Sequence, residues 1–117
     1  MAITVYGIPN CDTVKKARRF LDNAGVEYRF HNFKKDGLSE ALAAEWAAAV
    51  PHETLINRRG TTWRKLPEAS RENLDPARAA ALAVAEPSVV KRPVVNWGDS
   101  ITVGFDPEDW ANRLTDR

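Results

Sequence analysis

The first fifty residues alternate between strand-like and helix-like patterns, which limits the folds open to this chain of 117 residues. A β-rich run at 3–6 ends at a turn signal, and apolar residues then recur at helical spacing over 14–24. Apolar and polar residues alternate over 26–30, as in a strand with one buried face. The order strand–helix–strand is that of two parallel strands joined by a crossover helix.

A second helix is predicted directly after this unit. Ser39 can cap its start and Pro51 ends it, and the spacing of Leu42, Trp46 and Ala49 places these three side chains inward. The chain thus continues the alternation of strands and helices that is typical of the α/β class.

The remaining sequence predicts short helical turns, one longer helix, a hairpin and a terminal helix. Periodicity is weak over 52–70, and Asp75–Pro76 then begins a helix with a capping aspartate. The runs 93–97 and 101–103 flank a Gly–Asp turn and predict an antiparallel hairpin, and Asp106–Pro107 begins the last helix. At this length, residues 1–117 are expected to form a single domain.

Four tryptophans stand out among the apolar residues. Trp46 and Trp110 have apolar partners at helical spacing and are expected in the core. Trp63 and Trp97 lack that pattern, so they could instead line a groove.

Composition excludes several classes of protein. The formal net charge of +1 argues against a nucleic-acid-binding arm, and no apolar run is long enough to cross a bilayer. We find no signal peptide, and one cysteine cannot form an internal disulfide, so we expect a cytoplasmic protein without a membrane partner. One cysteine and two scattered histidines give no metal-ligand spacing, so neither a metal nor a bound cofactor is expected.

Cys11 is expected at the junction of the first strand and the first helix. A thiol there meets unpaired backbone N–H groups and the positive end of the helix dipole, which both favour the thiolate. Lys15 adds positive charge one turn further on, and Thr13 offers a hydroxyl. A lone cysteine is more often a small buried apolar residue, but the polar loop before Cys11 argues against burial.

Basic residues gather in two further segments. Residues 55–66 hold four arginines and lysines around one tryptophan, which could grip a phosphate, a carboxylate or an RNA backbone; a solvated surface is the ordinary alternative. Arg92 could supply a fixed positive charge to an anion or to a thiolate, or simply be solvated. Pro93 could hold a cis peptide bond or merely begin a strand.

Three sequence segments together carry a resemblance to a known family. They are YGIPNCDTVKKAR at 6–18, NRRGTTWRKL at 57–66 and KRPV at 91–94. In this order and spacing they resemble the arsenate-reductase-like (ArsC/Spx) family of the thioredoxin-like fold, and most of all its YffB-like subgroup. The resemblance covers nearly the whole chain.

The resemblance implies a four-stranded mixed sheet with a helical insertion at roughly 52–90. It also implies that Cys11 is the catalytic thiol and that Pro93 is a cis proline facing it. The residues that it implies for binding an anion or glutathione are Asn10, Thr13, Lys15, Arg58, Arg59, Arg92 and Pro93.

The sequence also departs from the patterns of this family. Glutathione-using arsenate reductases hold the oxyanion with several arginines, of which Arg92 matches the one before the proline. Asn57, or Arg58 after a one-residue shift, stands at a second such position, and Gly104–Phe105 at a third, where no arginine exists. Spx-like regulators, which bind RNA polymerase, carry a Cys-x-x-Cys motif, whereas Val14 follows Cys11 at that spacing.

These features favour a glutathione-dependent thiol reductase with a single catalytic cysteine. Since the chain has no resolving cysteine, glutathione is the expected co-substrate, together with a small disulfide or oxyanion substrate. Two alternatives are a glutaredoxin-type arsenate reductase and a non-catalytic Spx-like regulator that binds RNA polymerase.

Overall fold

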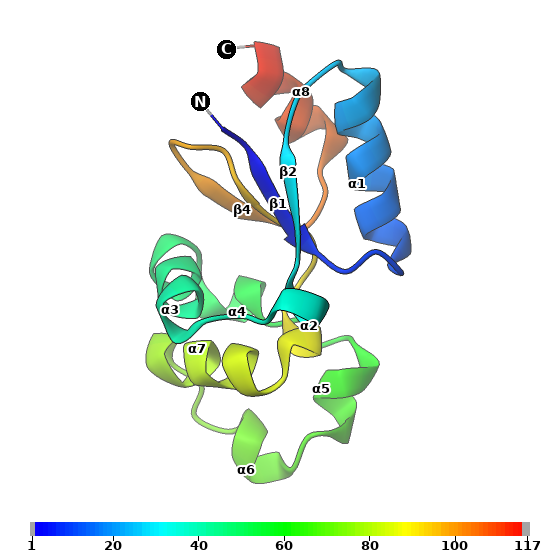
Figure 1. Cartoon of the computed structure of the whole chain (residues 1–117). Coiled ribbons are helices and arrows are strands. Elements are labelled where there is room, and N and C mark those ends of the chain that lie inside the picture. Colours follow the sequence, from blue (N-terminus) through cyan, green and yellow to red (C-terminus); the bar gives the residue numbers. More distant parts are fainter. Residues whose placement is uncertain (1, 116–117) are drawn as a thin grey trace.

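The computed structural model describes residues 2–115, which contain one four-stranded mixed sheet with helices packed around it (Figure 1). Its strands, in spatial order β2-β1-β3-β4, are β1 (Thr4–Gly7), β2 (Arg29–Asn32), β3 (Val94–Asn96) and β4 (Ile101–Val103). β2 runs parallel to β1, while β3 is antiparallel to both β1 and β4. The α/β class and the four-stranded mixed sheet are therefore confirmed.

The helices fall into two groups. Those beside the strands are α1 (Asp12–Asn23) and α8 (Pro107–Thr115). The others are α2 (Phe33–Asp36), α3 (Glu40–Ala49), α4 (His52–Leu55), α5 (Thr61–Lys65), α6 (Glu68–Arg71), α7 (Pro76–Ala85) and the 3-10 turn η1 (Pro87–Val89). In Figure 1 this second group forms a separate helical layer at the end of the sheet opposite the two termini, in which α3 packs against α7.

The predicted helix starts at Ser39 and Asp75 are confirmed. The Ser39 hydroxyl accepts the N–H of Leu42 at 3.1 Å, and the Asp75 carboxylate accepts the N–H of Arg78 at 2.7 Å. Each cap satisfies one of the free N–H groups at a helix start.

The second strand lies later in the chain than its alternating pattern predicted. Pairing with β1 begins at Arg29, because residues before it close the end of α1, where the N–H of Val26 donates to the carbonyl of Leu21 at 3.1 Å. The face was predicted correctly, since Tyr28 and Phe30 pack against the same core cluster as Val26.

The buried stripe of α3 also differs from the prediction. Trp46 is fully buried and Leu42 is half-buried, but Ala49 is exposed, and Ala43 and Ala47 are buried instead. The large indole sets which face of the helix packs inward, and Ala49 lies just outside that face.

The two faces of the sheet have separate cores. Val5 and Val95 point to the face covered by α1 and α8, where they share a cluster with Leu21 and Trp110. Leu114 is partly buried against that cluster. This face holds α1 through Ala17 and Leu21.

The helical layer packs against the opposite face of the sheet. Tyr6 packs against the ring of Trp46, with ring centroids 5.1 Å apart, and Val94 belongs to the same cluster. Burial raises the pKa of the Tyr6 hydroxyl above its ordinary value, and the carboxylate of Glu45 adds to the rise.

Trp97 lines no groove, contrary to one sequence-based possibility. Its side chain is 1% exposed, its ring meets that of Trp110 at 5.1 Å, and its Nε1 donates to Thr102 at 2.9 Å. Trp63 is half-buried, with the Arg58 guanidinium 5.6 Å above its ring. In residues 2–115 we find no helix that combines the length and apolarity needed to cross a membrane.

Candidate functional site

Cys11 lies at the N-terminus of α1, as the sequence predicted. It is the N-cap residue with an extended backbone, its carbonyl accepts the N–H of Lys15 at 2.9 Å, and its side chain makes no capping bond. The end of β1 approaches α1 closely, since a side chain at Gly7 would come within 2.9 Å of Val14. The thiol is partly exposed rather than buried.

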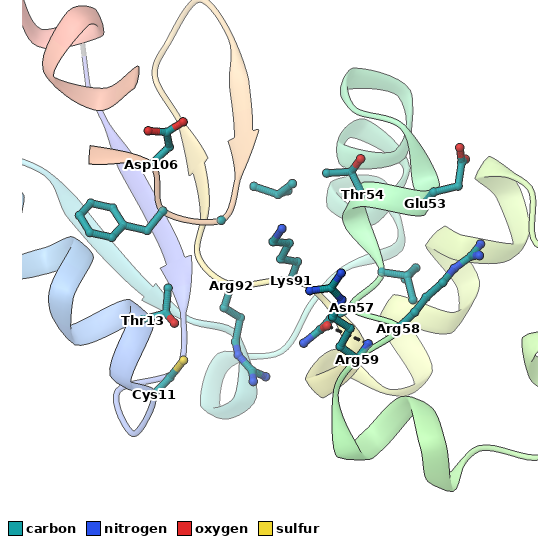
Figure 2. A pocket seen from close by; sticks show the side chains of 14 residues that line it. Cys11, Thr13, Glu53, Thr54, Asn57, Arg58, Arg59, Lys91, Arg92 and Asp106 are labelled. Atoms are coloured by element: carbon teal, nitrogen blue, oxygen red, sulfur yellow. Dashed lines mark hydrogen bonds between the residues drawn. The ribbon is translucent and has the colours of Figure 1, made fainter. Parts of the chain in front are cut away.

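Cys11 borders a cleft of about 850 Å³ between the sheet and the helical layer (Figure 2). Three parts of the chain form its walls: the start of α1, the segment around α4, and the segments next to β3 and β4. The lining residues are Cys11, Thr13, Glu53, Thr54, Ile56, Asn57, Arg58, Arg59, Lys91, Arg92, Val103, Gly104, Phe105 and Asp106.

Backbone hydrogen bonds hold two of these walls together. The N–H of Asn57 donates to the carbonyl of Val89 at 2.7 Å, and that of Lys91 donates to the carbonyl of Leu55 at 2.8 Å. The buried pair Ile56 and Val90 forms a short antiparallel bridge between them. The helical layer therefore presents its arginines at a fixed place beside β3.

The two arginines that follow Asn57 lie in a turn that Asn57 stabilises. The side-chain oxygen of Asn57 accepts the N–H of Arg59 at 3.1 Å, and its carbonyl accepts the N–H of Gly60 at 3.4 Å. Asparagine side chains stabilise such turns by replacing a backbone acceptor. Asn57 thus shapes the wall in addition to lining it.

Positive charge prevails in the cleft. Four cationic side chains line it, and within residues 2–115 none of them forms an ion pair: Arg58, Arg59, Lys91 and Arg92. The two acidic residues are already engaged, because Glu53 pairs with His52 at 2.8 Å and Asp106 accepts N–H groups at the start of α8. An anionic ligand could therefore bind these cations without displacing an acidic side chain from them.

Arg92 and Lys91 point in different directions from adjacent positions. Arg92 donates to the carbonyl of Ser88 at 3.2 Å and extends to the end of the cleft where Cys11 lies (Figure 2). Lys91 points to the end that carries Asp106 and Thr54. Successive side chains of an extended segment alternate in this way, so one short segment supplies positive charge to both ends.

The structure brings together some of the predicted site residues and separates others. Cys11 shares the cleft with Thr13, Arg58, Arg59 and Arg92. Asn10 lines a smaller neighbouring hollow with Lys34 and Lys35, and Lys15 is exposed on α1 outside the cleft.

Pro93 is buried and does not line the cleft. The bond between Arg92 and Pro93 is cis, as the resemblance implied. The Pro93 carbonyl accepts the N–H of Gly104 at 2.9 Å, which ties the segment after β4 to the segment before β3.

Sequence reasoning did not identify Lys91, Glu53 or Asp106 as site residues. Lys91 carries a signal, since it precedes Arg92 in an extended segment, but the direction of its side chain depends on tertiary pairing. No local pattern in the sequence marks Glu53 or Asp106 as a site residue, because each lies far along the chain from Cys11. Among residues 2–115, no three His, Cys, Asp or Glu side chains gather in a way that could hold a metal ion.

Gly104 is expected to tolerate no side chain without loss of stability. Its φ is +81°, so Gly104→Ala should lower the free energy of unfolding by about 1–2 kcal/mol, as measured by urea denaturation. Gly37, with φ +82° and open space around it, is a matched control, and Gly37→Ala should cost a similar amount. Unchanged stability of Gly104→Ala would contradict the left-handed backbone at this position.

Comparisons with known proteins agree with this architecture. The sequence profile of the ArsC family matches residues 6–112. An uncharacterised protein from Haemophilus influenzae is 35% identical over 108 residues, covering 92% of this chain and 95% of its own length.

Two solved structures are similar in both sequence and fold. A protein named YffB is 45% identical with a TM-score of 0.92, covering 96% of this chain and 98% of its own. An arsenate reductase (ArsC) related protein from Brucella melitensis is 47% identical with a TM-score of 0.76, covering 97% and 95%. With the mixed sheet and with Cys11 at the start of α1, these matches show that the chain belongs to the ArsC family and has its thioredoxin-like fold.

Proposed function

We propose that this protein is a glutathione-dependent thiol reductase with Cys11 as its nucleophile. The observation that carries the proposal is the position of a partly exposed cysteine at a helix N-terminus, beside a cleft lined by four cations that form no ion pair within residues 2–115. The thiolate is the reactive form of cysteine, and a partly exposed thiol can be reached by a substrate. The cations favour an anionic co-substrate, and glutathione carries net negative charge at neutral pH.

The proposed reaction has two thiol–disulfide exchanges. The Cys11 thiolate attacks the glutathione sulfur of a mixed disulfide, forms a Cys11–glutathione disulfide and releases the substrate as a thiolate, which takes up a proton. A second glutathione, as its thiolate, attacks that glutathione sulfur, which releases Cys11 as a thiolate and forms oxidised glutathione. Over the two exchanges, the substrate sulfur is reduced to a thiol and the second glutathione is oxidised, while the first glutathione sulfur stays in a disulfide throughout.

We assign supporting roles in this reaction to the arginines of the cleft. Arg92, anchored to the Ser88 carbonyl and directed to the end with Cys11, suits a carboxylate of the bound tripeptide. Arg59 faces the same space from the turn that Asn57 holds. The reaction would take place in the cytoplasm, where reduced glutathione is available.

A turnover assay tests this proposal. We expect the wild-type protein to reduce a glutathionylated peptide in the presence of glutathione, with a rate that saturates as the peptide concentration rises. Oxidised glutathione is measured through NADPH consumption by added glutathione reductase. A rate equal to that without protein would contradict the proposal.

Arsenate reduction is a second candidate, favoured by the cations that line the same cleft as Cys11. Asn57 and Gly104 supply no positive charge to the cleft, so we rank it below disulfide reduction. The same assay with arsenate as the oxidant separates the two. If neither substrate is turned over and RNA polymerase is captured equally by wild type and Cys11→Ser, the Spx-like regulator replaces both enzymatic readings.

A further inference from the structure

A second hollow, of about 310 Å³, lies next to Cys11 and outside the cleft. Its lining residues are Ile8, Pro9, Asn10, Asn32, Lys34 and Lys35, and we call it the lysine hollow. None of these residues lines the cleft, but Asn10 directly precedes Cys11 in the chain. Two hollows that both carry cations therefore meet near the thiol.

Strand pairing brings the lysine hollow to this place. β1 and β2 are parallel and end at the same edge of the sheet, with Gly7 opposite Asn32. The chain after Gly7 leads to Cys11, and the chain after Asn32 leads into α2, which carries Lys34 and Lys35. Figure 1 shows α2 next to the end of β1. The two loops that leave this edge thus hold the nucleophile and the two lysines.

The short helix α2 is held in place from within. Phe33 is 1% exposed, and its ring lies 6.3 Å from that of Trp46. The side-chain oxygen of Asn32 accepts the N–H groups of Lys34 and Lys35 at 3.2 and 3.1 Å. Since these N–H groups are already engaged, the groups that α2 offers to a ligand in the hollow are the two lysine ammonium groups.

These ammonium groups are open to an anionic partner. Both lysines are exposed, and within residues 2–115 neither forms an ion pair. Asp12 and Asp36 are the acidic residues next to Cys11 and to the lysines along the chain, and they line neither hollow. Charge complementarity therefore favours a ligand with carboxylates.

The proposed reaction requires such a ligand to bind near Cys11. The two sulfurs of a disulfide are only about 2 Å apart, so both halves of the mixed disulfide bind close to the Cys11 thiol. Because glutathione occupies the cleft in that reaction, the polypeptide half has to leave the thiol on another side. An extended chain covers about 3.3–3.6 Å per residue, so residues close to the modified cysteine can reach the lysine hollow.

We propose that the lysine hollow binds acidic residues of the glutathionylated polypeptide. A glutamate or aspartate within a few residues of the modified cysteine would accept hydrogen bonds from Lys34 and Lys35. This assignment rests on the proposed function and adds a substrate class to it, namely mixed disulfides of glutathione with acidic polypeptide segments.

Two glutathionylated peptides of equal length test the assignment. One has glutamates on both sides of the modified cysteine, and the other has glutamines at the same positions. We expect wild type to turn over the glutamate peptide with a kcat/KM about three- to tenfold higher, mainly through KM, as exposed ion pairs allow. Lys34→Gln/Lys35→Gln should remove most of this preference and leave the rate for the glutamine peptide unchanged.

Arg64→Gln/Lys65→Gln is the matched control. It removes the same charge from two adjacent, exposed positions of another short helix, and neither residue lines the cleft or the lysine hollow. We expect this variant to keep the wild-type preference. An equal loss of preference in both double variants would show that net charge selects the peptide, and it would overturn the assignment.

The other failures are distinguishable from failure of the proposed function. If wild type turns over both peptides equally well, or if Lys34→Gln/Lys35→Gln keeps the full preference, the assignment is wrong and the proposed function stands. If wild type turns over neither peptide, both proposals are wrong.

Discussion

Cys11→Ser is expected to reduce turnover of a glutathionylated peptide to the rate measured without protein. A serine hydroxyl does not ionise at neutral pH and cannot form the mixed disulfide, and within residues 2–115 no other cysteine could replace it. The same substitution should not harm the fold. Cys11 is an N-cap residue without a capping bond, and serine is a preferred N-cap, so stability should stay equal or rise by up to about 1 kcal/mol.

Two measurements on this variant separate chemistry from folding. NADPH-coupled turnover reports the reaction, and urea denaturation reports the free energy of unfolding. A stable variant that keeps a tenth or more of the wild-type rate would show that Cys11 is not the nucleophile. A large loss of stability would show instead that the thiol has a structural role.

Trp46→Ala is expected to cause the largest loss of stability among these substitutions. The side chain is fully buried, and its ring lies 5.1 Å from that of Tyr6 on β1 and 6.3 Å from that of Phe33 on α2. Removing a buried tryptophan typically costs about 3–5 kcal/mol, a large part of the stability of a domain of this size. Its Nε1 has no hydrogen-bond partner within residues 2–115, so the cost arises from packing.

Urea denaturation of matched variants checks this prediction. Trp46→Phe should lose much less, because it keeps an aromatic ring in the cluster, and Trp63→Ala should also lose less, because Trp63 is only half-buried. A loss below about 1 kcal/mol for Trp46→Ala would contradict the role of this ring in joining the sheet to the helical layer.

Local signals account for the parts of the fold that were predicted correctly. Ser39 and Asp75 cap their helices through their own neighbours, and the hairpin follows from a Gly–Asp turn between two β-rich runs. The position of Cys11 is also local, since it depends only on a strand, a turn and an amphipathic helix.

Errors arose where tertiary packing decides the outcome. The start of β2 depends on pairing with β1 and on the end of α1, neither of which is visible in an alternating pattern. Ala49 was predicted wrongly and Trp97 was left open, because the orientation of α3 and the packing of α8 determine which side chains are covered.

The cleft could be predicted only in part for the same reason. A cysteine and three arginines were marked by sequence patterns, but Lys91 and Asp106 join them only because β3 and β4 meet the helical layer. Contacts between residues so far apart in the chain leave no periodic trace.

Intact-mass spectrometry after incubation with oxidised glutathione tests most directly whether Cys11 is an open and reactive thiol. We expect the folded wild-type protein to gain one glutathione, the folded Cys11→Ser variant to gain none, and added dithiothreitol to remove the modification. A wild-type protein that stays unmodified when folded, but gains glutathione once it is denatured in urea, would contradict the account.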